Sequence, residues 1–181
     1  MELETTPIIG AYVIKNKKYN DKRGFFSEIW NQNKFNEKLN NKFKFVQENY
    51  SSSKKNVLRG LHYQIKNPQG KLVRVSNGSI YDVIVDLRQS SLSFKKWFGV
   101  KLSYSSNKIL WVPPGCAHGF HVLSKTANVT YKTTDFWFPE YERCIVWNDP
   151  DLKIDWNISN SPVLSVKDSK GKKLKDAEYF I

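Results

Sequence analysis

Three histidines, His62, His118 and His121, are the side chains of this sequence best suited to proton transfer near neutral pH. Unperturbed imidazole has a pKa of about 6.5, so that it accepts a proton in this range. His62 lies close to Arg59 in the segment LRGLHYQ, and Lys71 follows shortly after it. This set predicts the removal of a proton from an acidified carbon, with cationic side chains stabilising the resulting oxyanion.

The sequence contains no motif of several other common catalytic classes. The sequence has no G-x-S-x-G, G-x-G-x-x-G or G-x-x-x-x-G-K-[ST] pattern, so serine-hydrolase, dinucleotide and P-loop chemistry have no support. The pattern Pro113-x-Gly115-x-x-His118 is typical of metal-binding barrels, whose other half is a His-x-His pair followed by Glu. The matching place reads His62-Tyr63-Gln64, which lacks the second histidine. We therefore predict no bound metal and no other cofactor.

The composition describes a globular chain with a basic surface. Aromatic residues make up 14% of the 181 residues, which excludes a disordered chain. The formal net charge of +12 attracts anions such as phosphates or nucleic acid. Because the lysines are scattered and form no run of five, an ordinary solvated surface explains the charge as well as a polyanion would. We predict no nucleic-acid partner.

The small number of cysteines and the lack of long apolar segments indicate the compartment in which the protein is expected. Cys116 and Cys144 belong to no C-x-x-C motif and are too few for a disulfide framework, which favours a reducing environment. The N-terminus has no signal-like apolar run, and no stretch of 18 apolar residues occurs. The expected location is the cytoplasm, with no membrane partner.

Short strands separated by turns must position the chemically active side chains. In Phe45–Tyr50, Gln47 and Asn49 share one face with Phe45, and Glu48 and Tyr50 lie on the other. Further strands are predicted at Ala11–Lys15, Phe25–Trp30, Leu58–Gln64, Lys71–Val75, Ile80–Asp86, Phe98–Ser103, Ile109–Val112, Phe120–Leu123 and Asn128–Thr134, and one helix at Asn33–Leu39. Strands at such regular spacing are typical of a sandwich or barrel. Residues 148–181 are loop-rich, and we expect them to wrap a single domain spanning residues 1–181.

The regularity of the strand predicted at Leu58–Gln64 decides whether Arg59 and His62 can reach the same site. On a regular strand Gly60, His62 and Gln64 share one face, and Arg59 points to the other. Arg59 and His62 can act in one site only if Gly60 hosts a bulge or a twist.

A series of short motifs runs through about residues 8–178. In order, they are Asp21-x-Arg23-Gly24-Phe25-Phe26-x-Glu28, Gln47-x-Asn49-x-Ser51, Leu58–Gln64, Gln69-Gly70-Lys71-Leu72-Val73, Asp82-Val83-Ile84-Val85-Asp86-x-Arg88, Pro113-x-Gly115-x-Ala117-His118-Gly119-Phe120, Tyr131-Lys132, Glu142, Trp147-Asn148-Asp149-Pro150 and Lys167-Asp168. This series resembles the dTDP-4-dehydrorhamnose 3,5-epimerases, a branch of the cupin superfamily.

The resemblance implies an all-β, cupin-type jelly-roll barrel with a few short peripheral helices, in a homodimer that exchanges N-terminal strands. It also implies an isomerase that works without a cofactor on a nucleotide-linked 4-keto-6-deoxyhexose. The reaction would invert C3 and C5 of dTDP-4-dehydro-6-deoxyglucose and give dTDP-4-dehydro-L-rhamnose, a precursor in dTDP-rhamnose and polysaccharide biosynthesis. In this chemistry the C4 ketone acidifies the hydrogens on C3 and C5.

The resemblance also assigns roles to residues. It implies that His62 is the general base, that Asp168 orients it, that Tyr131 is the acid on the opposite face of the sugar, and that Lys71 lies beside the C4 oxygen. The residues implied to hold the nucleotide sugar are Arg23, Phe26, Glu28, Gln47, Asn49, Arg59, His118, Trp137, Glu142 and Lys167.

Two departures from the family pattern leave alternatives open. Cys116 stands where the family usually has Phe, and Trp137 where it usually has Tyr. If the Trp137 ring stacks on the base, thymine recognition would change, so a GDP- or CDP-linked keto sugar remains an alternative substrate. The same residues would also serve an enzyme that inverts C3 only or C5 only. A non-catalytic sugar-binding cupin, a further alternative, would not need the combination of His62, Tyr131 and Asp168.

Overall fold

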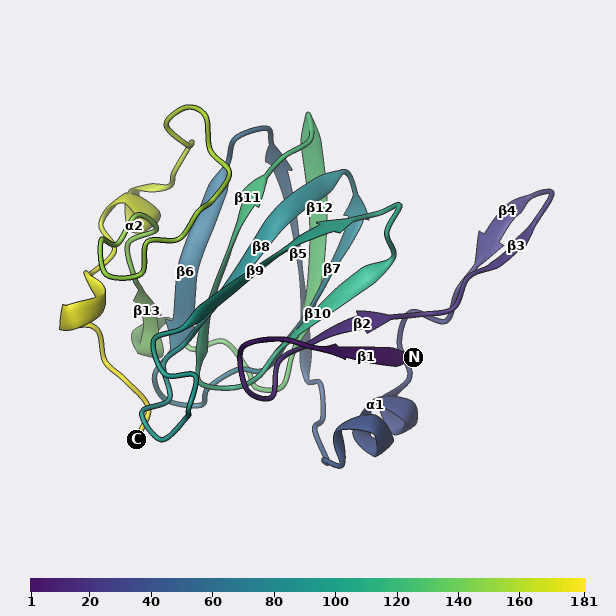
Figure 1. The fold of residues 1–181 in the computed structure, drawn as a ribbon, viewed down its shortest axis with the longest axis horizontal. Helices are drawn as coiled ribbons and strands as arrows, with labels where there is room; N and C mark the ends of the chain where they lie inside the picture. Colours follow the sequence, from purple (N-terminus) through teal and green to yellow (C-terminus); the bar gives the residue numbers. More distant parts are fainter.

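The strands form two antiparallel sheets that lie face to face in the computed structural model, which describes residues 1–181 (Figure 1). In spatial order, the six-stranded sheet contains β1 (Glu2–Thr5), β2 (Tyr12–Lys15), β10 (Lys108–Val112), β7 (Lys71–Asn77), β12 (Thr126–Thr133) and β5 (Gln47–Lys54). The five-stranded sheet contains β13 (Glu142–Cys144), β6 (Leu58–Gln64), β11 (Cys116–Val122), β8 (Ser79–Asp86) and β9 (Trp97–Ser103). The remaining elements are the hairpin of β3 (Tyr19–Asp21) and β4 (Gly24–Phe26), the helices α1 (Gln32–Leu39) and α2 (Val166–Ser169), and the 3-10 turns η1 (Pro139–Tyr141) and η2 (Leu174–Asp176). The predicted all-β class is confirmed.

Successive strands from β5 to β12 cross between the two sheets, except that β8 and β9 are hydrogen-bonded neighbours in the five-stranded sheet. The six-stranded sheet contains the order β5-β12-β7-β10, and the five-stranded sheet contains the order β6-β11-β8-β9. These two orders describe a jelly roll, in which eight strands form two Greek keys. The jelly-roll barrel implied by the resemblance is therefore confirmed, and the helices are few and short, as expected.

Apolar side chains from the inner faces of both sheets fill one part of the barrel. They are Val73, Val75, Leu110, Val112 and Val129 from the six-stranded sheet, and Ile80, Ile84, Leu102, Phe120 and Val122 from the five-stranded sheet. Burying an aliphatic or aromatic side chain of this size contributes about 1.5–3 kcal/mol to folding. This core fixes the spacing of the two sheets and thus of any cavity between them.

Helix α1 covers the outer face of the six-stranded sheet. Asn31 caps its first turn by accepting a hydrogen bond from the backbone N–H of Lys34 (3.1 Å), and Asn40 ends it in the left-handed region with φ 46°. Its buried residue, Phe35, packs edge-on against Trp111 of β10 with 5.1 Å between the ring centroids. The helix predicted at Asn33–Leu39 is confirmed.

The C-terminal segment, residues 148–181, covers the outer face of the five-stranded sheet and lies beside β6 and β13 in Figure 1. Leu152, Trp156 and Leu174 are buried there in one cluster with Tyr63 of β6. This packing holds α2 against β6, so that a side chain from the end of the sequence can reach a strand near its start.

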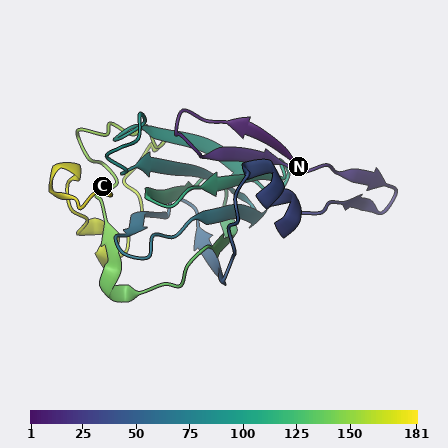
Figure 2. The same ribbon diagram turned by 90° about the horizontal axis from the view of Figure 1, so that it is seen from below.

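The β3–β4 hairpin projects away from the barrel in both views (Figures 1 and 2). The strand predicted at Phe25–Trp30 is wrong beyond Phe26, because β4 ends there. Trp30 instead packs its ring against Phe35 and Phe45, with centroid distances of 5.1 and 4.7 Å. After the hairpin, Trp30 therefore packs at the edge of the apolar cluster around Phe35 and Trp111.

Strand β11 begins at Cys116, four residues before the predicted start at Phe120. All seven of its residues are buried. A strand with both faces covered shows no alternation of apolar and polar residues, so its start could not be found from the sequence pattern. The earlier start places His118 inside the sheet.

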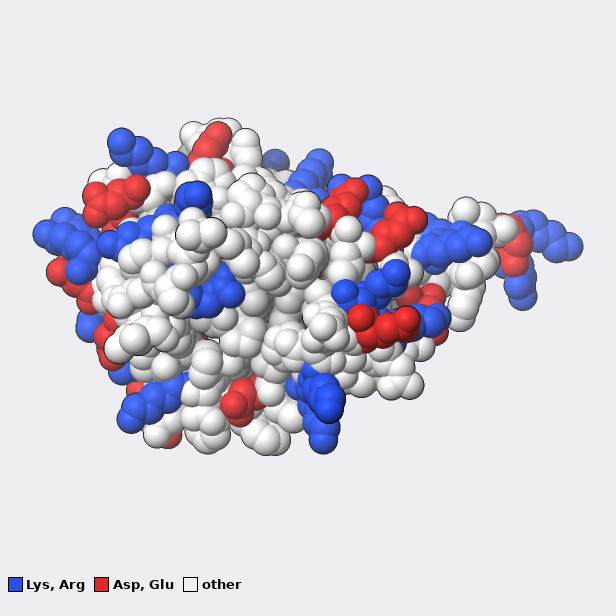
Figure 3. Space-filling model, turned by 60° about the horizontal axis from the view of Figure 1, so that its bottom comes forward, with Lys and Arg blue, Asp and Glu red and all other residues white.

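Charged side chains of both signs are interspersed over the face drawn in Figure 3, and the projecting hairpin carries basic side chains next to acidic ones. The hairpin tip has the sequence Asp21-Lys22-Arg23. No helix in this structure has both the length and the apolar character that crossing a membrane requires.

Candidate active site

A cavity of about 290 Å³ opens between the two sheets. Its walls come from Gln47, Asn49, Ser51, Gln69, Lys71 and Tyr131 on the side of the six-stranded sheet, from Arg59, His62, His118, Gly119, Phe120 and Glu142 on the side of the five-stranded sheet, and from Trp137 and Lys167. Polar and charged side chains predominate, which suits a ligand with many hydrogen-bonding groups. Of the fourteen site residues named from the sequence, ten line this cavity and Asp168 hydrogen-bonds to one of the ten.

Strand alternation places the polar residues of β5 in the cavity. Gln47, Asn49 and Ser51 are every second residue and line the wall, whereas Glu48 and Tyr50 point to solvent. The predicted faces of this strand are confirmed. Ser51 was missed as a site residue, although the same two-residue period points to it.

A bulge at Gly60 brings Arg59 and His62 to one cavity. His118 of β11 pairs with His62 of β6, but Phe120 pairs with Arg59, so β6 has one extra residue in this interval. Gly60 has φ +119°, and a Cβ atom there would lie 2.5 Å from Gly119 Cα. Only glycine fits this close approach, and the irregularity expected at Gly60 is confirmed.

His62 and Asp168 form a hydrogen-bonded pair at the edge of the cavity. His62 Nε2 lies 2.5 Å from Asp168 Oδ1, and the carboxylate is held from its other side by Ser165 Oγ, which donates to Oδ2 at 2.7 Å. Ser165 also caps α2, because its Oγ accepts the backbone N–H of Asp168 at 3.1 Å. The Asp168 residue is only 3% exposed. Its position is therefore fixed by the helix start as well as by the histidine.

The environment sets the protonation of this pair. Burial lowers the pKa of His62 below its ordinary value and outweighs the opposite effect of Asp168. Burial acts to raise the pKa of Asp168, but hydrogen bonds from His62 and Ser165 more than offset it and lower that pKa. Near neutral pH the imidazole is thus neutral and the carboxylate ionised. Nε2 then carries the proton that Asp168 accepts, which leaves Nδ1 with a free lone pair as the basic nitrogen.

Lys71 places an ammonium group beside the base. It is buried, and its Nζ donates to the backbone carbonyl oxygen of His62 at 3.4 Å. Burial lowers the pKa of Lys71 to about 8, against the attraction of Glu142 and Asp82. The group remains mostly protonated at pH 7, so it offers a positive charge in a place where water is scarce.

Tyr131 faces the cavity from the opposite sheet. It belongs to β12, whereas His62 belongs to β6, and both line the same cavity. Burial raises the pKa of the Tyr131 phenol, and Glu142 adds to this effect. The phenol therefore stays protonated near neutral pH and can donate its proton.

The polar side chains around this centre hold one another in place. Gln47 Nε2 donates to Asn49 Oδ1 at 2.9 Å, and the backbone N–H of Trp137 donates to Gln47 Oε1 at 3.1 Å. Lys167 and Glu142 form an ion pair at 2.9 Å. Trp137 is 51% exposed at the cavity rim, where a planar ligand can reach its ring.

A second histidine–carboxylate pair lies inside the sheet. His118 Nε2 and Asp82 Oδ1 are hydrogen-bonded at 2.7 Å, and both residues are buried. Asp82 lies on β8, next to β11, and was not named as a site residue from the sequence. The sequence offered one signal for Asp82, which directly precedes the apolar run Val83-Ile84-Val85. A carboxylate in such a strand is rarely buried without a partner, so a partner was to be expected.

Three predicted site residues do not reach the cavity of their own chain. Arg23, Phe26 and Glu28 belong to or follow the projecting hairpin. Phe26 is 70% exposed, Arg23 pairs with the neighbouring Asp21 at 2.6 Å, and Glu28 pairs with Lys34 at 2.7 Å. Phe26 and Glu28 line a separate surface hollow with a volume of about 420 Å³.

Comparison with known proteins identifies the family. Residues 5–176 match the family model described as dTDP-4-dehydrorhamnose 3,5-epimerase. The chain is 54% identical over 162 residues to the dTDP-4-dehydrorhamnose 3,5-epimerase of Pseudomonas aeruginosa, covering 90% of each protein. The crystal structure of the enzyme of that name from Elizabethkingia anophelis NUHP1 superposes with a TM-score of 0.94 at 43% identity, covering 99% of each chain.

A solved structure with a bound sugar nucleotide is equally similar. It is the dTDP-6-deoxy-D-glucose-3,5-epimerase of Legionella pneumophila Philadelphia 1 in complex with dTDP-4-keto-L-rhamnose. It superposes with a TM-score of 0.94 at 44% identity, covering 98% of this chain and 94% of the other. Since the family model, the relatives and the fold agree over nearly the whole length, this chain belongs to the dTDP-4-dehydrorhamnose 3,5-epimerase family of isomerases.

Proposed function

We propose that this chain inverts C3 and C5 of dTDP-4-dehydro-6-deoxyglucose with His62 as base and Tyr131 as acid. The observation that carries the proposal is the placement of the His62–Asp168 pair and Tyr131 on opposite walls of one polar cavity. A group that removes a proton from one face of a ring and a group that supplies one to the other face are what inversion requires. The sugar nucleotide bound to the Legionella relative supports the substrate class.

The proposed reaction moves protons and one electron pair within the enzyme and the sugar. His62 Nδ1 takes the proton from C3 or C5, and the C–H electron pair forms the enolate whose charge rests on the C4 oxygen. Lys71 stabilises this oxyanion, and Tyr131 gives a proton to the same carbon from the other face. Asp168 stabilises the imidazolium formed in the first step. Each inversion leaves His62 protonated and Tyr131 deprotonated, and proton exchange with solvent restores both, so that the scheme balances without a metal or an organic cofactor.

Cationic and aromatic side chains at the cavity fit the nucleotide part of the substrate. Arg59 and Lys167 line the same cavity as the catalytic base His62, and an Arg guanidinium suits phosphate oxygens in particular. The exposed Trp137 ring at the cavity rim is available to stack on the nucleobase of the substrate. The free thiols of Cys116 and Cys144 are consistent with a reducing cytoplasm as the place of the reaction.

Incubation in D₂O tests the proposed activity directly. The purified enzyme with dTDP-4-dehydro-6-deoxyglucose should incorporate deuterium at both C3 and C5, because solvent hydrogen replaces each abstracted proton. Proton NMR of the recovered sugar nucleotide measures this, with enzyme-free substrate as the control. Exchange at one centre only would replace the proposal with a C3-only or C5-only epimerase, and no exchange at either would leave a binding protein.

We further propose that the chain acts as a homodimer in which the β3–β4 hairpin completes the cavity of the partner. The hairpin projects away from the barrel (Figure 1). Its Phe26 ring is 70% exposed within one chain. Arg23 and Phe26 would then provide a cation for the phosphates and a ring for the base in the second copy.

Complementation between two inactive variants tests this arrangement. Arg23→Ala and His62→Asn should each give inactive homodimers with about twice the mass of the 21.1 kDa chain by light scattering. After subunit exchange, each mixed dimer has one cavity with both His62 and a partner Arg23, so activity should return. The control is a mixture of Arg23→Ala with a double variant carrying both changes, which contains no intact pair and should stay inactive. A fully active monomer, or no recovery in the mixed dimer, would contradict the proposal.

A further inference from the structure

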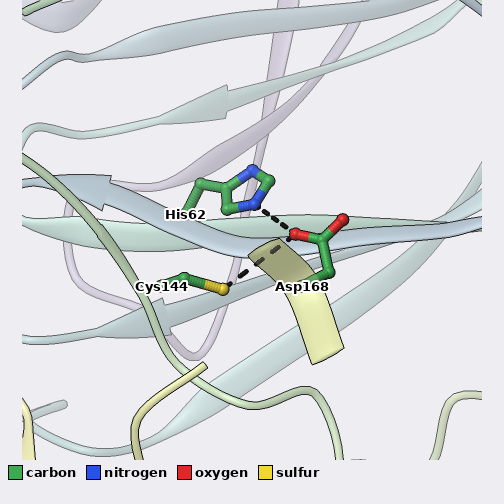
Figure 4. A group of neighbouring side chains, drawn as sticks. All are labelled: His62, Cys144 and Asp168. Atoms are coloured by element: carbon green, nitrogen blue, oxygen red, sulfur yellow. Dashed lines mark hydrogen bonds and ion pairs between the residues drawn. The ribbon is translucent and has the colours of Figure 1, made fainter. Parts of the chain in front are cut away.

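Three different metal-binding atoms converge beside the cavity (Figure 4). Cys144 of β13 pairs across the sheet with His62 of β6, and α2 brings Asp168 to the same point. Asp168 Oδ1 lies 2.5 Å from His62 Nε2 and 4.0 Å from Cys144 Sγ, and the three ligand atoms lie within 4.8 Å of one another. An imidazole nitrogen, a thiolate sulfur and a carboxylate oxygen are the three ligand types that Zn²⁺ accepts.

The cluster has the support that metal ligands usually receive from their surroundings. The second oxygen of Asp168 accepts a hydrogen bond from Ser165, and the backbone N–H of Gly60 donates to Oδ1 at 3.4 Å. Such outer contacts orient the ligands of metal sites. The His62 side chain is 23% exposed, and it lines the cavity, so an ion can enter from there.

The distances fit a tetrahedral ion after small side-chain rotations. With zinc bonds of about 2.0–2.3 Å, neighbouring ligand atoms lie about 3.4–3.6 Å apart. The present separations differ from these by about 1 Å. We propose that His62, Cys144 and Asp168 form a binding site for Zn²⁺, with the fourth position open to the cavity, and that zinc bound there inhibits the enzyme.

The charges balance even though Lys71 lies nearby. Zinc releases the thiol proton of Cys144 to solvent, and the Nε2 proton of His62 moves to Nδ1. The thiolate and the carboxylate together neutralise the two positive charges of the ion. Lys167, the other nearby cation, is already paired with Glu142. The occupied site is therefore neutral, whereas the empty site carries the single negative charge of Asp168, so that binding makes the surroundings of Lys71 one unit more positive.

Zinc on Nε2 would switch off the base by reversing its tautomer. A neutral imidazole carries one proton, so that a metal on Nε2 leaves this proton on Nδ1. Nδ1 is the nitrogen assigned above to proton abstraction, and it can no longer accept a proton. This inhibitory effect rests on the proposed function, but zinc binding does not.

Cobalt spectroscopy tests the binding without reference to activity. Co²⁺ added to the metal-free, tag-free protein should give the strong visible absorption of a tetrahedral site and a thiolate charge-transfer band. Cys144→Ser should lose the charge-transfer band, whereas Cys116→Ala, which removes the other thiol, should keep it. Absence of the band in the unaltered protein, or its persistence in Cys144→Ser, would overturn the proposal. Circular dichroism shows whether each variant is folded, and Cys144→Ala serves if Cys144→Ser is not.

Inhibition is measured separately. Zn²⁺ should suppress turnover of the unaltered enzyme, a chelator should restore it, and Cys144→Ser should need at least about tenfold more zinc for the same inhibition. Cys144→Ser should turn over normally without zinc, since its thiol has no part in the proton transfers. Zinc that binds without slowing turnover would refute the inhibitory role. If the protein has no epimerase activity at all, the proposed function fails, while the cobalt spectrum still decides whether the site exists.

Discussion

His62→Asn is expected to lower turnover by about 10²–10⁴-fold, the usual effect of losing a general base. The asparagine side chain is too short to reach the Nε2 position, but Asp168 keeps its hydrogen bonds from Ser165 Oγ and the Gly60 backbone N–H, so the local structure survives. Asparagine has no basic nitrogen, however, and cannot take a proton from C3 or C5. A coupled reductase assay for the epimerised product measures the rate, and exchange in D₂O should fall with it.

A matched substitution separates this effect from a general loss of histidine. His121 is also buried on β11, but its Nε2 bonds to Asn56 at 3.1 Å, and it does not line the cavity. His121→Asn should keep the turnover of its folded fraction. Binding of dTDP by His62→Asn, measured by calorimetry, should be nearly unchanged. A His62→Asn variant that keeps more than about a tenth of the rate would show that another group is the base.

The strand pattern was sufficient to predict which residues of β5 share a face, and the family resemblance identified that face as a wall of the site. On β5 the polar residues Gln47 and Asn49 alternate with solvent-facing ones, and a period of two assigns them to one face without further information. The bulge at Gly60 could also be predicted from neighbouring residues alone, because Arg59 and His62 cannot share a face on a regular strand. Local geometry thus sufficed where the deciding neighbours lie within a few residues.

Contacts between distant segments could not be predicted from pattern alone. Asp168 meets His62 because residues 148–181 pack over the five-stranded sheet, and only the family resemblance suggested this pairing. The position of Cys144 opposite His62 depends on the β13–β6 register, which no turn or repeat in the sequence specifies. The metal-ligand cluster was therefore missed, because the His-x-His pair was the only sequence pattern considered as a source of metal ligands.

Tyr131→Phe should separate proton exchange from inversion. Phenylalanine keeps the ring and its packing but removes the phenolic donor. His62, on the opposite wall, can still remove a proton, and once its own proton has exchanged with solvent it can return a deuteron to the same face. Substrate recovered from D₂O should contain deuterium, measured by proton NMR. The coupled assay should detect little inverted product, with a loss of about 10²-fold or more.

The outcomes of this experiment discriminate between roles for Tyr131. Tyr63→Phe is the matched control, because Tyr63 is also largely buried but faces the outer core cluster, away from the cavity. Burial raises the pKa of Tyr63 to about 12, so it too is a protonated phenol at neutral pH, and its loss should leave inversion intact. Full product formation by Tyr131→Phe would show that water or another residue is the acid. Loss of both exchange and inversion would mean that Tyr131 is needed before the first proton transfer, for binding or for enolate formation. Exchange without inversion is the one result that requires a base and an acid on opposite walls, as the two sheets place them.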